Sequence, residues 1–301
     1  MKIARLAPIA LLASAALLLS GCVNNAPATP AGSAAASGGA ASVTKDDDAA
    51  AKLPEEIVSA GKLVIGTDAT YAPNEFKDAA GNPVGWEIEL ADAMAAKLGL
   101  TTEYNIAKFD NIIPSITGGK YDVGLSSFFD TKERQQQVDM IDYYTAGIQW
   151  AALAGKTIDP DDACGIKLAV QNGTTEALDD GPAKSDACVA AGKEPIQLLG
   201  YDTQDDATAA VTLGRADAMS ADSPVTQYAV AQSGGKLETQ GDVYSVFLYG
   251  MPIAKDRGTL GEALQAALQS LMDDGTYTSI LEKWGVEQGA IDAIDINGAT
   301  E

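Results

Sequence analysis

The sequence predicts an α/β protein with largely parallel sheets, and two features of it indicate this class. Short apolar runs that end in turn-forming residues alternate with longer segments whose apolar residues recur at helical spacing. The chain has 301 residues, which is enough for two domains of ordinary size. No unit of about 20 to 50 residues repeats along it, so a solenoid is not expected.

The predicted strands are short apolar runs bounded by turn formers. The first covers residues 63–68 and ends at Asp68. The others cover residues 102–107, 123–127, 167–171, 196–199 and 216–221.

Helices are predicted between these runs. Apolar residues recur at helical spacing from Ile88 to Leu98, and Gly99 ends the pattern. Two further helical patterns cover residues 206–213 and 260–284, and the second carries a stripe of leucines along one face.

The charge of the chain excludes several classes of partner and of site. The sequence has 20 Lys and Arg against 42 Asp and Glu, a formal net charge of −22. Phosphate backbones and anionic lipid surfaces repel such a chain, so we expect no nucleic-acid partner. The absence of histidine excludes Ser-His-Asp and Cys-His catalysis and histidine-ligated zinc. Catalysis by carboxylates stays open, and neither a cofactor nor a metal ion is expected.

Residues 1–21 are predicted to be a signal peptide, with Lys2 and Arg5 before a mostly apolar run. The segment that ends at Cys22 resembles the lipobox of bacterial lipoproteins, in which the cysteine is lipidated; the alternative is a buried cysteine. Residues 22–52 are rich in Ala, Ser, Gly and Pro, so we expect the anchored cysteine to be followed by a flexible tether. Folded sequence is expected to begin near Leu53.

Two further cysteines, Cys164 and Cys188, lie in the part of the chain that should fold. An exported chain meets surroundings that permit disulfides, so we predict that the two are bonded. Closing a loop of this length should contribute about 3 kcal/mol to stability on the chain-entropy model. The alternative is two separate buried thiols.

Six short motifs occur in a fixed order along the chain. They are GTDATYAP (66–73), VGWEIEL (84–90), FDNIIP (109–114), GKYD (119–122), TKER (131–134) and GRADA (214–218). In this order and spacing they make residues 53–285 resemble a family 3 extracellular solute-binding protein, the amino-acid-binding component of an ABC importer.

The resemblance implies the type II periplasmic-binding-protein fold, in which two α/β lobes are joined by two crossing strands with the ligand cleft between them. The crossings are expected near residues 146–152 and 244–249. Lobe 1 would then comprise residues 53–145 and 250–285, and lobe 2 residues 146–249. Residues 286–301 are expected to form a loose C-terminal tail.

The family binds a zwitterion, which needs a forked cation for the carboxylate and an anion for the ammonium. Arg134 matches the family's arginine that holds the ligand carboxylate; the alternative is a surface pair with Asp130. Asp222 matches the carboxylate that receives the α-ammonium; the alternative is the N-cap of a helix that begins at Ser223 and Pro224.

The segment Gly173, Thr174 and Thr175 matches the second lobe's contact with the same carboxylate, at the start of a predicted helix. An ordinary turn is the alternative. Ser126 and Ser127 match positions that contact the ammonium or the carboxylate, although serines are also common at strand ends.

Asp68, Tyr71 and Phe109 match positions near the ligand side chain, with Phe109 as an aromatic wall. Their alternatives are a turn residue and two core aromatics. Two positions depart from the family: Asn74 stands where many relatives have Phe, and Phe129 lies where a small hydroxyl residue is usual. We expect a polar amino acid as ligand, with a basic one as the alternative through Asp68.

The resemblance implies a monomeric binding protein that captures a free amino acid by hinge closure and delivers it to an ABC permease. It would be held at the extracytoplasmic face of the membrane through Cys22. Two alternatives stay open, a sensor that presents its closed form to a receptor and a dehydratase-type enzyme on the same fold.

Overall fold

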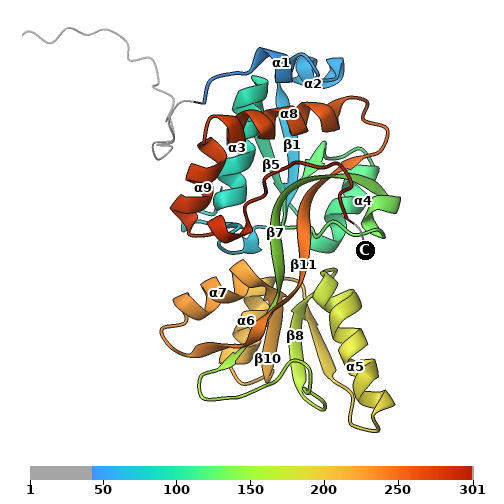
Figure 1. The fold of residues 1–301 in the computed structure, drawn as a ribbon, viewed down its shortest axis with the longest axis vertical. Helices are drawn as coiled ribbons and strands as arrows, with labels where there is room; N and C mark the ends of the chain where they lie inside the picture. Colours follow the sequence, from blue (N-terminus) through green and yellow to red (C-terminus); the bar gives the residue numbers. More distant parts are fainter. Residues whose placement is uncertain (1–42, 300–301) are drawn as a thin grey trace, which may run out of the picture. The chain divides into compact units, whose positions relative to one another are not determined.

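The computed structural model describes residues 43–299. The predicted signal peptide and Cys22 lie outside this part of the chain. Within it, no helix combines the length and the apolar composition needed to cross a membrane. The described residues form two α/β lobes that share two long strands, β7 (Val138–Leu153) and β11 (Leu237–Ala254) (Figure 1).

Lobe 1 is built on a parallel three-stranded sheet in the order β5-β1-β6. Its strands are β1 (Lys62–Thr67), β5 (Thr101–Ile106) and β6 (Val123–Gly124), and a small antiparallel sheet adds β2 (Thr70–Tyr71), β3 (Glu75–Lys77) and β4 (Pro83–Val84). Its helices are α1 (Asp47–Ala50), α2 (Glu55–Ala60), α3 (Trp86–Leu98), α4 (Ile112–Thr117), α8 (Leu260–Asp273) and α9 (Thr276–Trp284).

Lobe 2 is built on a five-stranded sheet in the order β11-β7-β10-β8-β9. The strands β8 (Lys167–Gln171), β9 (Gln197–Tyr201) and β10 (Ala218–Asp222) are parallel, and β7 is antiparallel to β10. Its helices are α5 (Gly181–Ala190), α6 (Gln204–Thr212) and α7 (Ser223–Gln232). Four short turns of other helix types complete the described chain: η1 (Phe109–Asn111), η2 (Arg134–Gln136), η3 (Glu176–Asp180) and η4 (Glu287–Gly289).

The strands β7 and β11 pair with each other along both lobes, from Val138 opposite Ala254 to Leu153 opposite Leu237. Almost every residue of β7 is buried, as expected for an apolar strand covered on both faces. The register of the pair shifts between residues 240 and 250. The predicted lobe boundaries therefore fall inside these two continuous strands.

The predicted helix over residues 260–284 is two helices, which corrects that prediction. The leucine stripe of α8 is buried as expected. Gly275 then adopts a left-handed conformation with φ of 80°, and α9 starts after it in a new direction. Because both helices carry an apolar face, the sequence pattern runs through the break.

The predicted tether is too long, because residues 43–52 belong to the folded part. The carboxylate of Asp46 accepts the backbone N–H groups of Asp48 and Ala49 at 3.0 Å and so caps α1. Ala49 is buried in the core of lobe 1. Alanine is common in linkers, but the small side chain of Ala49 allows α1 to pack closely against the core.

The C-terminal residues up to 299 are not a loose tail, which corrects a third prediction. They run beside β7 (dark red in Figure 1), where Asn297 and Met140 exchange hydrogen bonds of 2.8 and 2.9 Å. The backbone N–H of Ala299 donates to Asp130 at 3.0 Å. Ile294 is buried as well, but one buried apolar residue and backbone pairing produce no periodic pattern from which an element could be predicted.

The predicted disulfide between Cys164 and Cys188 is confirmed, and it joins the loop before β8 to α5 in lobe 2.

Candidate functional site

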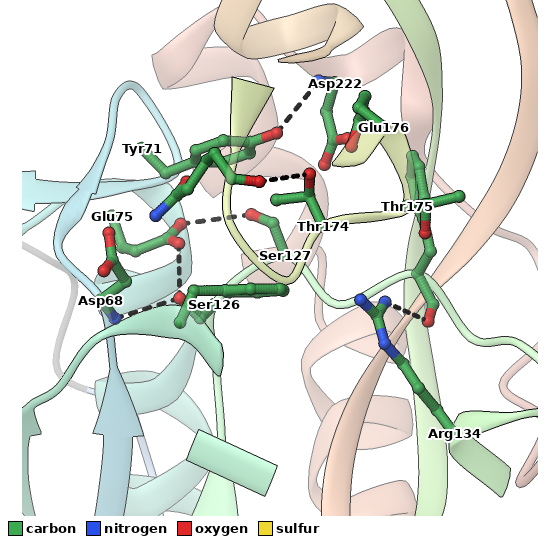
Figure 2. Close-up of a pocket in the computed structure, with 13 residues that line it drawn as sticks. Asp68, Tyr71, Glu75, Ser126, Ser127, Arg134, Thr174, Thr175, Glu176 and Asp222 are labelled. Carbon is green, nitrogen blue, oxygen red and sulfur yellow. Dashed lines mark hydrogen bonds between the residues drawn. The ribbon is translucent and has the colours of Figure 1, made fainter. Parts of the chain in front are cut away.

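One pocket lies between the two lobes (Figure 2). Thirteen residues line it: Asp68, Tyr71, Glu75, Phe109, Ser126, Ser127, Phe129, Arg134, Gln171, Thr174, Thr175, Glu176 and Asp222. Nine of the ten residues that the sequence suggested for ligand binding are among them, and Gly173 lies directly beside it. The structure thus brings the predicted set together, and their contact with a ligand stays a prediction.

Arg134 enters the pocket from lobe 1 at the start of η2. Its guanidinium donates to the carbonyl of Phe129 at 2.8 Å and, across the pocket, to the carbonyl of Gly173 at 3.2 Å. It also lies over the rings of Phe109 and Phe128, which are stacked 4.4 Å apart. These contacts hold the planar group in place while leaving further N–H groups for an anion.

The alternative for Arg134, a surface pair with Asp130, is not what the structure shows. Asp130 is buried and accepts instead from the side chain of Gln135 at 2.8 and 2.9 Å and from Ala299. No salt bridge joins Asp130 to Arg134 within residues 43–299. Burial lowers the pKa of Arg134, and the negative charges of Asp222 and Glu176 oppose that change.

Asp68 follows the last residue of β1, which places it at the edge of the sheet where the pocket opens. Its backbone N–H donates to the Ser126 hydroxyl at 3.0 Å, and its carboxylate accepts from the Thr70 hydroxyl. Burial raises the pKa of Asp68, and hydrogen bonds from Thr70 and Gln171 oppose the rise. Parallel strands β1 and β6 end side by side, so Asp68 and Ser126 meet.

Two buried glutamates hold the serines of lobe 1. The hydroxyl of Ser126 donates to Glu75 at 2.8 Å. Ser127 donates to Glu87 through its hydroxyl at 2.8 Å and its backbone N–H at 3.2 Å, and it has a φ of 55° in the left-handed region. Tyr143 donates to Glu87 at 2.6 Å. Burial raises the pKa of Glu87 to about 7.

Asn74 is fully buried behind the pocket and is not one of the residues that line it. Its side chain accepts from the Trp86 indole at 2.7 Å and donates to the Ser127 hydroxyl at 2.8 Å. The departure from the family at this position therefore supplies a polar contact. Asn74 makes this contact to Ser127, which lines the pocket, and does not itself line it.

The aromatic residues Tyr71 and Phe109 are both buried at the pocket. The hydroxyl of Tyr71, from lobe 1, accepts the backbone N–H of Asp222, from lobe 2, at 3.0 Å. Tyr71 is therefore one of the groups that already join the lobes. Phe109 forms the stacked pair with Phe128 beneath Arg134, so it is both a wall of the pocket and a core aromatic.

The segment from Gly173 to Thr175 follows β8, and η3 and α5 come after it. Gly173 has a φ of 82°, and a β-carbon there would lie 2.9 Å from the β-carbon of Asp110. Only glycine combines that conformation with such a close approach between lobes. The Thr174 hydroxyl donates to the carbonyl of Gln171 at 2.9 Å, which fixes the turn.

Asp222 is the last residue of β10 and precedes α7, but its carboxylate makes no capping bond to that helix. It accepts instead from the Tyr249 hydroxyl at 2.5 Å. The carboxylate of Glu176 lies beside it (Figure 2), and the two interact. Burial raises the pKa of Asp222 well above its usual range, and the charge of Glu176 raises it further.

Sequence reasoning missed Glu75, Gln171 and Glu176 as pocket residues and treated Phe129 only as a departure from the family. Glu75 and Glu176 directly follow residues that had been examined, and their acidic character was the available signal. With Asp68 and Asp222 they place four carboxyl groups around one guanidinium. Within the described residues, no group of three or more His, Cys, Asp or Glu could hold a metal ion.

Comparison with known proteins agrees with the motifs. A family model described as bacterial extracellular solute-binding proteins, family 3, matches residues 63–287. The arginine-binding protein ArgT of Corynebacterium glutamicum is 41% identical over 251 residues, which cover 82% of this chain and 82% of that protein. The lysine/arginine/ornithine-binding periplasmic protein of Escherichia coli is 30% identical over 251 residues, covering 78% and 89%.

A solved structure of an ancestral arginine-binding protein bound to arginine has a TM-score of 0.69 and 34% identity, and the match covers 74% of this chain and 98% of that one. The predicted fold class is therefore confirmed. So is the prediction of a binding protein over an enzyme, since the relatives are binding proteins. The chain belongs to the bacterial extracellular solute-binding proteins of family 3.

Proposed function

We propose that this protein captures a basic amino acid, arginine first, for an ABC importer. The single observation that carries the proposal is the charge of the pocket, where four carboxyl groups face one guanidinium. A neutral amino acid brings one positive and one negative charge, whereas arginine brings a second positive charge for the surplus acids. Relatives named for arginine binding support the same ligand.

The groups of arginine have natural partners in this pocket. The guanidinium of Arg134 would hold the α-carboxylate with two parallel hydrogen bonds, and Thr175 would approach from the other lobe. Asp222 would receive the α-ammonium. The ligand side chain would then extend between Tyr71 and Phe109 toward Asp68 and Glu75.

A basic amino acid was the alternative ligand predicted from the sequence. The presence of Glu75 in the pocket favours a basic ligand over a neutral polar one. Asp68 alone could hydrogen-bond a neutral amide, but a second buried acid beside it needs either a proton or a cation. A guanidinium can donate to two carboxylates at once. The surplus acids therefore suit a planar, permanently charged side chain.

Because Arg134 lies in lobe 1 and Asp222 in lobe 2, the ligand would bridge the lobes and stabilise their closed arrangement. The strands β7 and β11 would act as the hinge. The differential affinity of the ligand for the closed form would shift the population toward it. That form would be the one recognised by the membrane permease.

We also propose that a lipid on Cys22 anchors the chain at the extracytoplasmic face of the membrane. Acyl chains contribute about 0.8 kcal/mol per buried methylene, so several chains on one residue suffice to hold it. Replacing Cys22 with Ala should move the protein from the membrane fraction to the soluble one after cell fractionation. Retention of the variant on the membrane would contradict the anchor.

The ligand proposal is tested by calorimetry on the chain from Val23 onward. We expect L-arginine to bind more tightly than L-citrulline, which has the same shape but a neutral end group. Asp68→Asn should reduce that preference, because it removes a charge beside the side chain. Equal affinity for the two ligands in the unaltered protein would overturn the basic specificity.

The placement of the site is tested by Arg134→Ala, which leaves the ligand carboxylate buried without a cation. Arginine affinity should fall by about 3 to 5 kcal/mol, or some hundredfold to several thousandfold. Arg134→Lys keeps the positive charge but not the forked pair of donors. Its arginine affinity should therefore lie between that of the unaltered protein and that of the alanine variant. Near-normal affinity in the alanine variant would show that the site is misplaced.

A further inference from the structure

The wall of the pocket in lobe 2 contains two carboxyl groups, Glu176 from the start of η3 and Asp222 from the end of β10. Glu176 is only 1% exposed and Asp222 only 3%. Figure 2 shows the two groups next to each other, facing the space between the lobes. The Oε1 atom of Glu176 has no hydrogen-bond partner within residues 43–299, although it is buried.

The groups around this pair supply few donors. Asp222 accepts from Tyr249 at 2.5 Å, whereas its own N–H is donated away to Tyr71. Arg134 is a cation that interacts with both carboxyl groups, but its two terminal nitrogens are bonded to backbone carbonyls. Burial raises the pKa of Glu176 and the negative charge of Asp180 raises it further, whereas hydrogen bonds from Asp222, a backbone N–H and Thr174 oppose the rise.

Two buried carboxylates in contact cannot both be charged at low cost unless a cation lies between them. The pair would therefore hold one proton, and the titration belongs to the pair rather than to either residue. Burial and mutual repulsion raise the pKa of Asp222, and burial raises the pKa of Glu176. A ligand ammonium brings the missing positive charge together with N–H donors, including one for the unpartnered Oε1 of Glu176.

We propose that Glu176 and Asp222 together receive the ligand's α-ammonium and that the proton they share is released to solvent as the ammonium binds. The inference rests on the proposed function, because it requires an amino-acid ligand in this pocket. The charges balance: a pair with one negative charge loses a proton, and the resulting two negative charges face the ammonium. Glu176 is thereby a ligand-binding residue in addition to Asp222.

Proton release is measured by calorimetric titration at pH 7 in phosphate, HEPES and Tris, whose ionisation enthalpies increase in that order. L-arginine and L-glutamine are both used, so that the amino-acid end is tested whichever side chain the pocket prefers. For the unaltered protein the observed heat should depend on the buffer, with about one proton released per ligand at the Glu176 and Asp222 pair. A heat that is the same in all three buffers overturns the inference and leaves the proposed function intact.

Glu176→Gln identifies the source of the proton. The number released should fall by about one, and affinity should fall about tenfold because one charged partner of the ammonium is lost. The matched control is Asp186→Asn, which removes an exposed charge of α5 that lies outside the pocket lining and should change neither quantity by more than about twofold. Thermal unfolding verifies that both variants are folded.

Two results would count against the proposal. Unchanged proton release in Glu176→Gln would assign the proton to another group, such as the glutamates of lobe 1. The absence of binding heat with either ligand would overturn the proposed function and this inference with it.

Discussion

Two buried acid pairs lie in or next to the pocket, one in each lobe, and they differ in hydrogen bonding; Glu87 is the one member that does not line the pocket. In lobe 1, Glu75 and Glu87 accept from the hydroxyls of Ser126 and Ser127, from a backbone N–H and from Tyr143. In lobe 2, Glu176 has a buried oxygen without a partner in the described chain. Both oxygens of Glu87 are satisfied by donors of the protein, and Glu75 also lines the pocket, where a ligand can reach it. Glu176 needs a donor that the described chain does not supply.

The difference shows that burial of an acid is not a sufficient sign of function. Both pairs have raised pKa values, and burial is the largest cause in each. What separates them is whether donors of the protein satisfy the oxygens. A saturated acid such as Glu87 stabilises the loop that carries Ser127, whereas an unsaturated one such as Glu176 favours a ligand that brings donors and charge.

The strongest test of this comparison is to remove the acceptor in lobe 1. Glu87→Ala leaves the Ser127 N–H and the Tyr143 hydroxyl buried without their acceptor. The free energy of unfolding should fall by about 3 to 4 kcal/mol, measured by urea denaturation. Glu87→Gln keeps one acceptor oxygen and should cost about 1 kcal/mol. If Glu87→Ala lowers the free energy of unfolding by no more than Glu176→Gln does, the comparison is contradicted.

The pH dependence of stability should report the same pair. The pKa of Glu87 is raised to about 7 in the folded protein from an ordinary value of 4.5, so the folded state binds more protons between these values. Its contribution is fully present below pH 4.5 and is lost as pH rises through 7, by up to about 3 kcal/mol. Urea unfolding from pH 5 to 8 should show this decline.

In Glu87→Gln the decline should be reduced, because the substituted group does not titrate. If the free energy of unfolding of that variant declines with pH as steeply as that of the unaltered protein, Glu87 is not the group that causes the decline.

Substitution in the lobe 2 pair should have the opposite effect, weakening ligand binding without lowering stability. Asp222→Asn removes a charged partner of the ligand ammonium, so affinity should fall by about 2 to 3 kcal/mol in calorimetry. The same change removes a buried ionisable group, which is costly to bury, so the free energy of unfolding should stay equal or rise by about 1 kcal/mol. A large loss of stability in this variant would mean that the second pair is structural too.

The sequence predicted much of this site because its residues follow strands. Asp68, Ser126 and Asp222 come at or just after the ends of strands β1, β6 and β10, and such ends gather at the edge of each sheet. The motif around Arg134 then supplied the cation. The family and the fold class followed from the same motifs.

Other features left no pattern in the sequence. Whether Glu176 faces the pocket depends on the irregular turn η3, which spacing does not define. The hydrogen-bond saturation of Glu87 depends on Ser127 and on Tyr143, which is 56 residues away. The segment beside β7 is held by hydrogen bonds to distant backbone and carboxylate groups and by burial of Ile294. Ala49 fits into the core because its side chain is small. Each of these depends on tertiary contacts and not on local preference.

The smallest effect is expected at the surface, where the lobes are joined by an ion pair between Lys108 and Asp202 at 2.6 Å. The two side chains are 56% and 53% exposed, so water screens the attraction. Lys108→Ala should weaken ligand binding by less than about 1 kcal/mol at physiological salt. The loss should be larger at about 0.01 M ionic strength, where screening is weak. Calorimetry at the two salt concentrations measures both. A loss as large as that of Asp222→Asn would place the energy of closure at the rim of the pocket instead of at its buried acids.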